Sequence, residues 1–412
     1  MPKVSVIMPA FNHGAFVGCA IESVLAQSFE DFELIVNDDA STDNTPEVIR
    51  SIKDPRVLSN LFSKNRGASW TVNAALRQAR GQYFAILNSD DYFLPGKLDL
   101  QVRFLDENPG IVAVFGWPCF IDERGEPLAG DKHSNWFETK NQSREEWLRR
   151  FFIIGNQLCH PTVMLRRSCY DEVGAYDPRL AQTPDFDLWI RICSRHNIHV
   201  LPQPLTAYRW LEGGRNASAQ TPLSIARTQW ELQYLLRHFL DLADDELRRV
   251  FSTEFAELDP DGSQAPKVLL GRLSLKLGQL WPPYRSFGLD VLHQELASGE
   301  CTISYNEYMR FTGACDVFGH NLRIERGQLE ERLSREAQAR EGLVREIEAM
   351  RASARTEREQ LEERLFREAD LRLQLIRTIE AMRTSTSWRT TRPLRYLGDK
   401  LKPIFYSRYR YS

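Results

Sequence analysis

The feature that most restricts the fold of this chain is an alternation of short apolar runs and helix-spaced segments over residues 4–87. The runs have the length and composition of buried strands, and the segments between them place apolar residues at helical spacing. Strands joined in this way by helices form a mostly parallel sheet with helices on both faces, so we expect an α/β fold. The strand-like runs are 4–8, 32–36, 56–60 and 83–87, and the helix-like segments are 16–27, 43–52 and 68–79.

The overall composition is typical of a globular protein without a dominant charge. Hydrophobic residues make up 42% of the 412 residues, and the formal net charge of −3 argues against general binding to nucleic acid. The seven cysteines are scattered and include no CxxC pair, which indicates reduced thiols rather than a disulfide framework or a zinc site. We find no signal-peptide pattern and no apolar run long enough to span a membrane, so the expected location is cytoplasmic.

Beyond the alternating part, the character of the chain changes. We assign residues 1–224 to the α/β domain and residues 225–319, which are leucine-rich and helically patterned, to a helical accessory region. A stretch rich in proline, glycine and aspartate, 258–266, interrupts this accessory region. Because no motif with recognisable chemistry occurs there, the sequence predicts no role for it.

Residues 320–385 carry an internal repeat that predicts a long helix. Residues 326–353 recur as residues 358–385, with 19 of 28 positions identical at a period of 32. Apolar residues recur at three- and four-residue spacings in both copies, which predicts a coiled coil that joins copies of the chain. A single solvated helix is the alternative. The apolar seam consists of Leu329, Leu333, Leu343, Ile347 and Met350, and of Leu361, Leu365, Leu375, Ile379 and Met382.

The last segment, residues 386–412, is a basic and aromatic tail. From residue 384 onward, seven Lys and Arg residues oppose the single acidic residue Asp399, and aromatic residues lie between them. Basic residues are attracted to anionic lipids, and Trp and Tyr favour the headgroup region. We therefore expect peripheral contact with the inner face of a membrane. A solvated tail and a nucleic-acid-binding tail are the alternatives, but no nucleic-acid-binding module accompanies it.

Three polar segments follow strands of the predicted sheet, where ligands of open α/β sheets bind. The first, Pro9–Asn12, is a turn of small residues that lets a ligand approach the backbone, and an ordinary loop is its alternative. The second contains Asp38 and Asp39, whose adjacent carboxylates are costly at a buried strand end unless they bind something. Turn and helix-cap chemistry is the alternative there, and we favour it for Asp43.

The third segment, Asn88–Asp91, ends in two carboxylates. Asp90 and Asp91 supply the hard oxygen ligands that Mg²⁺ and Mn²⁺ prefer. A metal ion bound there would bridge the phosphates of a nucleotide diphosphate and oppose the charge of the leaving group. A capped turn is the alternative, but two acidic strand ends in one sheet favour ligand binding.

These segments together resemble the opening of glycosyltransferase family 2. The resemblance rests on VSVIMPAFNHGAFVGCAIESVLAQSFEDFELIVNDDASTDNT, residues 4–45, and on NRGASWTVNAALRQARGQYFAILNSDDYFLPGKL, residues 65–98, and it covers residues 3–218. It implies the glycosyltransferase A fold, whose Rossmann-like sheet is mostly parallel. It also implies that a sugar is transferred from a nucleotide-diphosphate donor with inversion of the anomeric carbon.

The resemblance also implies roles for the residues at the strand ends. It places Ala10 and Asp39 beside the nucleobase and the ribose, and Asp90 and Asp91 beside the diphosphate and the metal ion. The implied cofactor is Mn²⁺ or Mg²⁺, held by Asp91 and Asp90. The predicted nucleotide-sugar contacts are Pro9, Ala10, Asn12, Asp38, Asp39 and Asp90.

The predicted catalytic base is Asp185. The segment AQTPDFDLWIRI, residues 181–192, resembles the family segment that carries the base, although Pro184 replaces the usual glutamate. Inversion needs one base, which removes the proton of the acceptor hydroxyl while the diphosphate leaves from the opposite face. A helix N-cap is the alternative role for Asp185, and the two roles can coincide. Asp187 is a rival carboxylate two residues further on.

Two more residues resemble positions on the acceptor or phosphate side of the family's cleft. His160 is expected to touch the diphosphate or the acceptor, and a structural histidine is the alternative. Arg209 is expected to neutralise phosphate charge; Leu211 stands where the family often has a histidine two residues after this arginine. Asn88 and Val72 also replace the aspartate and the arginine that are common in the family.

The resemblance places the chain in cell-surface polysaccharide synthesis, with a glycan or a lipid-linked molecule as acceptor. The segment SWRTTRPLR, residues 387–395, resembles tails of bacterial polysaccharide-assembly enzymes. One alternative is an inactive scaffold of the same fold that assembles partners through the coiled coil. Another is a nucleotidyltransferase that makes the sugar nucleotide, but PAFNHGAF lacks the glycine-rich basic loop that such chemistry favours.

Overall fold

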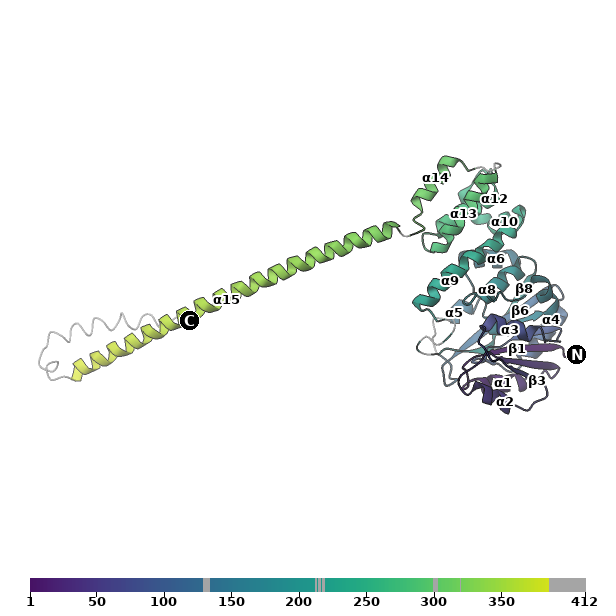
Figure 1. Cartoon of the computed structure of the whole chain (residues 1–412), viewed down its shortest axis with the longest axis horizontal. Coiled ribbons are helices and arrows are strands. Elements are labelled where there is room, and N and C mark those ends of the chain that lie inside the picture. Colours follow the sequence, from purple (N-terminus) through teal and green to yellow (C-terminus); the bar gives the residue numbers. More distant parts are fainter. Residues whose placement is uncertain are drawn as a thin grey trace. The chain divides into compact units, whose positions relative to one another are not determined.

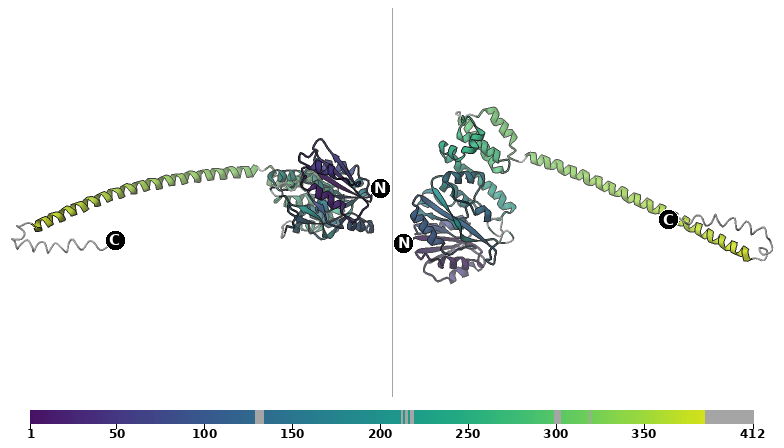
Figure 2. Two further views of the ribbon diagram at one scale, coloured as in Figure 1. Left: turned by 90° about the horizontal axis from the view of Figure 1, so that it is seen from below. Right: turned by 180° about the vertical axis from the view of Figure 1, so that it is seen from behind.

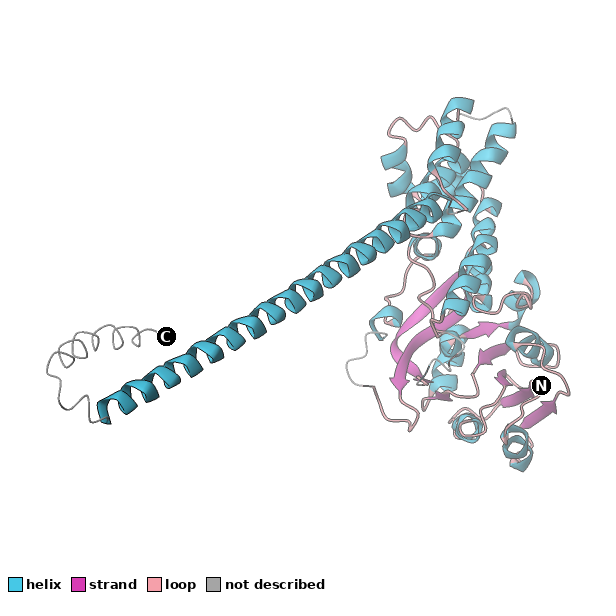
Figure 3. Cartoon of the chain, turned by 60° about the vertical axis from the view of Figure 1, so that its left-hand side comes forward, coloured by secondary structure: helices cyan, strands magenta, loops and turns pink. Residues whose placement is uncertain are grey.

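The computed structural model describes residues 1–128, 134–211, 213, 216, 219–298, 303–318 and 320–384. The chain divides into two compact units, Met1–Phe318 and Gly319–Ser412. The first unit contains a sheet covered by helices and, after residue 219, an all-helical part (Figure 1). In the sequence, all described strands precede this helical part; Figure 3 distinguishes strands (magenta) from helices (cyan).

One eight-stranded sheet organises the first unit. Its strands are β1 (Val4–Ala10), β2 (Phe32–Asp38), β3 (Val57–Leu61), β4 (Tyr83–Ile86), β5 (Tyr92–Phe93), β6 (Ile111–Ile121), β7 (Met164–Arg166) and β8 (Asn197–Arg209). Their order is β3-β2-β1-β4-β7-β6-β8-β5. The first four are parallel to one another, β7 runs antiparallel to β4 and β6, and β8 runs parallel to β6.

The sheet is buried on both faces. In β1, Val4, Val6 and Met8 pack on one side, and Ile7 packs on the other. The first side is covered by α1 (Val17–Leu25), α2 (Thr45–Ser51) and α4 (Lys97–Glu107), and the second by α3 (Ala68–Leu76), α6 (Arg144–Ile153) and α8 (Pro184–Cys193). Burial on both faces explains why the strands are continuous apolar runs rather than alternating ones. The short helices α5 (Ser134–Phe137), η1 (His160–Thr162) and α7 (Arg167–Val173) complete this part.

The predicted α/β fold is confirmed, with differences at the element ends. β1 and β2 extend to Ala10 and Asp38, two residues beyond the predicted ends, because these polar ends still pair in register. The helix predicted from residue 43 begins at Thr45. Asp43 precedes it and accepts hydrogen bonds from the Thr45 amide (2.9 Å) and the Gly14 amide (2.9 Å), which agrees with the capping chemistry favoured for it.

The helical part shares its core with the helices that cover the sheet. It contains α9 (Pro222–Leu235), η3 (Leu236–Asp241), α10 (Asp244–Val250), α11 (Ser252–Leu258), α12 (Pro266–Leu277), α13 (Pro282–Ser298) and α14 (Tyr305–Ala314). Phe152 of α6 contacts the rings of Phe239, Phe251 and Tyr284 at centroid distances of 4.9, 5.0 and 5.3 Å. The predicted boundary at residue 224 therefore falls inside one compact unit.

The second unit contains α15 (His320–Thr384), one continuous helix of 65 residues (Figure 2). Arg and Glu side chains pair along it at a spacing of four residues, as in Arg358–Glu362 and Arg367–Glu363. The apolar seam is exposed, with Leu343 at 59% and Met350 at 63%. The predicted helix is thus present, and the coiled coil stays a prediction. The basic tail, residues 386–412, lies outside the described residues.

Two sequence-level features can be checked against the described residues. No helix among them is long and apolar enough to cross a membrane. Six cysteines are described, and all six are free thiols. Cys159, Cys169 and Cys193 are buried in the core, as small apolar residues often are.

Candidate active site

Polar groups gather at the edge of the sheet where β1, β2 and β4 end. Ala10, the last residue of β1, lies opposite Asp38, the last residue of β2. β4 ends at Ile86, opposite Ile7, so the polar segment 88–91 follows on the other side of β1. The Asp39 amide donates to the Ala10 carbonyl at 2.8 Å. The predicted donor-side residues therefore lie side by side, as expected for a ligand site beyond the carboxyl ends of parallel strands.

Asp39 is fixed by the start of α3. Its two carboxylate oxygens accept hydrogen bonds from the Arg66 amide (2.9 Å) and the Gly67 amide (2.8 Å). Only 3% of Asp39 is exposed. Because each oxygen has two lone pairs, the anchored carboxylate keeps capacity for a further donor such as a ribose hydroxyl.

Asp38 and Asn12 hold the loops of this edge together. The Asp38 carboxylate accepts from the Ser41 amide (3.1 Å) and the Ser41 hydroxyl (2.5 Å). The Asn12 side chain accepts from the Thr42 amide at 2.8 Å, and Asn12 has a positive φ of 55°. Pro9 lies inside β1, opposite Asn37. The hydrogen bonds of Asn12 and Asp38 stabilise the conformations of the loops. Contact of Pro9, Asn12 and Asp38 with a nucleotide sugar stays a prediction.

Asp90 and Asp91 lie at the end of β4 in different surroundings. The Asp91 carboxylate accepts from the Arg209 amide (2.7 Å) and from the Asn88 side chain (2.9 Å). The Asp90 carboxylate lies 3.9 Å from the His13 ring, which itself bonds the Ser89 hydroxyl at 2.8 Å. Burial raises the pKa of Asp90, and burial together with the neighbouring charge of Asp90 raises the pKa of Asp91 well above its usual range.

This carboxylate pair fits a divalent cation. The charge of Asp90 adds to burial in raising the pKa of Asp91, although Arg209 opposes the rise, and a bound cation would stabilise both ionised carboxylates. Among the described residues, no group of three or more His, Cys, Asp and Glu side chains could hold a metal. Water and substrate phosphates would therefore complete the coordination, as is common for Mg²⁺.

Asp185, the predicted base, lies in the first turn of α8. The Asn156 side chain donates to its carboxylate at 3.0 Å. Burial raises the pKa of Asp185, although the nearby His160 opposes this effect. Burial lowers the pKa of His160, whose ring bonds the Tyr176 hydroxyl at 2.9 Å.

Asp91 and Asp185 both affect the pKa of one buried side chain. Burial, and then the negative charges of Asp91 and Asp185, raise the pKa of the Cys159 thiol. Cys159 comes directly before His160 and is itself 3% exposed. Two carboxylates that are 94 residues apart in the sequence, from the end of β4 and the start of α8, thus act on the same buried side chain.

Comparisons with known proteins identify the family of the chain. The profile of glycosyl transferase family 2 matches residues 5–173. An uncharacterized glycosyltransferase of Methanocaldococcus jannaschii is 30% identical over 213 residues, which cover 50% of this chain and 71% of that protein. The chain belongs to glycosyltransferase family 2.

Two further proteins help to place this family member. The Escherichia coli enzyme WfaP, a UDP-Glc:α-D-GlcNAc-diphosphoundecaprenol β-1,3-glucosyltransferase, is 38% identical over 106 residues, which cover 26% of this chain and 42% of WfaP. The structure of TarS residues 1–349 from S. aureus with UDP-GlcNAc matches at a TM-score of 0.50 and 19% identity, over 73% of this chain and 93% of that one. This structural likeness confirms the predicted glycosyltransferase A fold.

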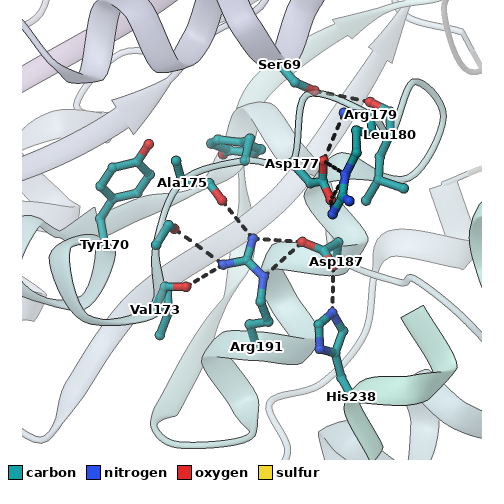
Figure 4. Close-up of polar contacts among 12 residues, drawn as sticks. Ser69, Tyr170, Val173, Ala175, Asp177, Arg179, Leu180, Asp187, Arg191 and His238 are labelled. Carbon is teal, nitrogen blue, oxygen red and sulfur yellow. Dashed lines mark hydrogen bonds and ion pairs between the residues drawn. The ribbon is translucent and has the colours of Figure 1, made fainter. Parts of the chain in front are cut away.

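Within this glycosyltransferase, Asp187 is fully engaged in structural contacts (Figure 4). One oxygen accepts from Arg191 (2.7 and 2.9 Å), and the other lies 2.7 Å from the His238 ring. Burial alone would raise the pKa of Asp187, but the His238 hydrogen bond and the Arg191 charge outweigh it and lower the pKa. A carboxylate held in this way is a weak proton acceptor, so the geometry favours Asp185 over Asp187 as base.

Arg209 lies beneath the Asp90–Asp91 turn. Its guanidinium donates to the carbonyls of Asp90 (2.8 Å), Asp122 (2.9 Å) and Glu123 (2.9 Å), and it stacks on the Phe16 ring at 4.7 Å. Only 4% of the residue is exposed. These contacts hold the turn in place. The role of Arg209 in neutralising phosphate charge stays a prediction.

Sequence reasoning missed three residues of the site. His13 beside Asp90 could have been noticed, because it follows the first strand in a polar loop. Asn156, which bonds Asp185, and Glu231, which bonds the backbone just before Asp185, belong to no recognisable motif. Their partners lie 29 and 48 residues away, a separation that leaves no local pattern.

Proposed function

We propose that this enzyme transfers a sugar from a nucleotide-diphosphate donor to a hydroxyl of a glycan or lipid-linked acceptor, with inversion at the anomeric carbon. The proposal is supported by two buried carboxylate sites, at the end of β4 and at the start of α8, whose charges both raise the pKa of the Cys159 thiol. Asp90 and Asp91 follow a strand end, where a diphosphate is expected, and Asp185 lies in the first turn of α8.

Each site suits one half of an inverting displacement. The Asp185 carboxylate, held by Asn156, accepts the proton of the acceptor hydroxyl while that oxygen attacks the anomeric carbon. A raised pKa makes this carboxylate a better proton acceptor than an ordinary aspartate. Asp39 receives the ribose, and its two bonds to the start of α3 fix it before the donor arrives.

Asp90 and Asp91 would hold a divalent cation, Mn²⁺ or Mg²⁺. When bound, such an ion supplies positive charge that stabilises the departing nucleotide diphosphate. The Asn88 amide and the Arg209 amide orient the Asp91 carboxylate for this role.

The acceptor class and the setting in cell-surface polysaccharide synthesis are supported by WfaP. That relative glucosylates a sugar carried on diphosphoundecaprenol. The basic tail, residues 386–412, would hold a cytoplasmic enzyme at the anionic inner leaflet, where a lipid-linked acceptor is exposed. Sedimentation with anionic and neutral liposomes, with and without residues 386–412, tests this part; equal pelleting in all cases contradicts it.

The test of the function is a screen of nucleotide sugars with Mn²⁺ or Mg²⁺. We expect one donor to raise the melting temperature only in the presence of metal and to be slowly hydrolysed. The alternative, an inactive scaffold, predicts neither effect. Donor hydrolysis that persists with excess EDTA would contradict the role of the metal while leaving the transferase assignment intact.

A further inference from the structure

The helical part of the first unit contacts the chain on both sides of Asp185. Glu231 of α9 is 2% exposed, and its carboxylate accepts from three consecutive amides: Ala181 (2.8 Å), Gln182 (2.9 Å) and Thr183 (2.9 Å). It also accepts from the Thr183 hydroxyl at 2.9 Å. Asp185 follows two residues after this anchored loop.

A second contact lies just after Asp185. The His238 ring of η3 bonds the Asp187 carboxylate at 2.7 Å, and Asp187 in turn holds Arg191. The Arg191 guanidinium donates to the carbonyls of Val173 (2.6 Å) and Ala175 (3.0 Å), as Figure 4 shows. The first turn of α8 is therefore held from α9 and η3 at both ends.

The chemistry of the Glu231 contact makes it hard to replace. Three successive amides that point at one centre form an anion site, and burial without the carboxylate would leave them unpaired. Charged hydrogen bonds to a buried carboxylate are among the stronger ones in proteins. The loop from Ala181 to Thr183 thus has its position set by α9 and not by its own sequence.

We propose that Glu231 is a positioning residue for the base Asp185, and that the helical part acts as a clamp that sets where this base meets the acceptor. The proposal rests on the proposed transferase function. It assigns a role in the reaction to residues 222–241, which carry no motif of their own. A displacement of about 1 Å of a reacting group can reduce a rate roughly 100-fold, so a clamp of this kind acts on kcat.

The test compares Glu231→Gln with Glu254→Gln in the full chain. Glu254 is a matched control because it also joins the helical part to the rest of the unit, by accepting from Arg149 of α6 at 3.0 Å. We expect Glu231→Gln to lower kcat for donor hydrolysis roughly 10- to 100-fold with an unchanged donor KM. Glu254→Gln should lower the melting temperature without changing kcat.

A double variant separates positioning from a general loss of stability. If Glu231 acts through Asp185, then Glu231→Gln combined with Asp185→Asn is no slower than Asp185→Asn alone. Independent effects would multiply instead, and that result would overturn the proposal. Normal kcat in Glu231→Gln would also overturn it.

A readout without activity keeps this proposal distinct from the proposed function. Hydrogen exchange at the amides of residues 181–183 should accelerate in Glu231→Gln and stay slow in Glu254→Gln. Unchanged protection in Glu231→Gln refutes the clamp. A wild-type protein that hydrolyses no nucleotide sugar would instead refute the transferase function, whatever the exchange rates show.

Discussion

Asp91 is almost completely buried, and the proposed function requires its carboxylate to be negatively charged. Its replacement by alanine should reduce donor hydrolysis by roughly 10³-fold or more, because several kcal/mol of charge stabilisation disappear with the cation. Metal-dependent stabilisation by the donor should vanish as well. Thermal shift with donor and Mn²⁺ measures this directly.

Asp91→Asn is the control for that variant. It keeps an oxygen that can accept from the Arg209 amide, so its melting temperature without ligands should stay near the wild-type value. Both variants should nevertheless lose the effect of Mn²⁺. Full activity in either of them would show that Asp91 holds no metal.

Asp185 and Asp187 are two residues apart, yet they should respond differently to the same change. Asp185→Asn should retain donor binding and lose roughly 10²- to 10⁴-fold in kcat, the usual contribution of a general base. Asp187→Asn breaks a buried ion pair and should cost about 3 kcal/mol of unfolding free energy, with a smaller loss of kcat. Measured rates and melting temperatures of both variants distinguish the two roles. The reverse pattern would identify Asp187 as the base.

The raised pKa of Asp185 predicts a shape for the pH profile. The base must be ionised to accept a proton, and a raised pKa keeps it protonated to a higher pH than an ordinary aspartate. The acid limb of kcat should therefore lie above the usual range for aspartate. Because His160 opposes the rise, His160→Gln should move this limb to still higher pH. A limb that stays in place in His160→Gln would contradict the proximity of the two groups.

At the scale of elements, the packing of α12 against α13 can be tested at a glycine. A Cβ added to Gly288 would lie 2.8 Å from the Gly271 carbonyl oxygen and 3.0 Å from the side chains of Ser274 and Leu275. Gly288→Ala should therefore destabilise the first unit by about 1–3 kcal/mol. Gly313 of α14 is the control, since a Cβ there meets nothing within 4 Å and alanine should stabilise by up to about 1 kcal/mol. Urea unfolding measures both, and equal stabilities would contradict the close contact.

The elements that the sequence predicts well are those with a local signal. β1, β2 and β4 are buried on both faces, so their continuous apolar runs stand out between helical segments. The acidic residues that follow β2 and β4 can be recognised in the sequence, because they come directly after these apolar runs. This is why the sequence singles out individual residues for the predicted donor side of the site.

The surroundings of Asp185 depend on contacts that leave no local signal in the sequence. β7 has only three residues and inserts between β4 and β6, and its partners Phe84 and Val114 give no indication of it. In the sequence, nothing distinguishes Glu231 from other glutamates of helices. Its carboxylate contacts three amides that lie about 50 residues earlier in the chain. Long-range contacts of this kind explain why the helical part had no predicted role.

At the scale of the whole molecule, α15 carries an apolar seam that one helix cannot bury. Leu333 and Leu365, one repeat apart, are 56% and 64% exposed, and the other seam residues described are similar. Arg and Glu side chains pair within the helix, as Arg367 does with Glu363, so its exposed apolar residues, the seam among them, would gain most from a partner helix. A second copy of the chain offers the same seam twice, which makes it the natural partner.

We therefore expect the full chain to be a dimer or a higher oligomer, and residues 1–318 to be monomeric and still able to hydrolyse donor. Leu343→Lys together with Leu375→Lys should dissociate the oligomer, because each removes about 2 kcal/mol of apolar burial per helix and places charges in the seam. Gln338→Lys, on the opposite face of the helix, should not dissociate it. Sedimentation equilibrium of the four proteins gives the masses. A monomeric full chain would leave α15 as a solvated helix, and loss of donor hydrolysis in residues 1–318 would mean that the second unit contributes to the site.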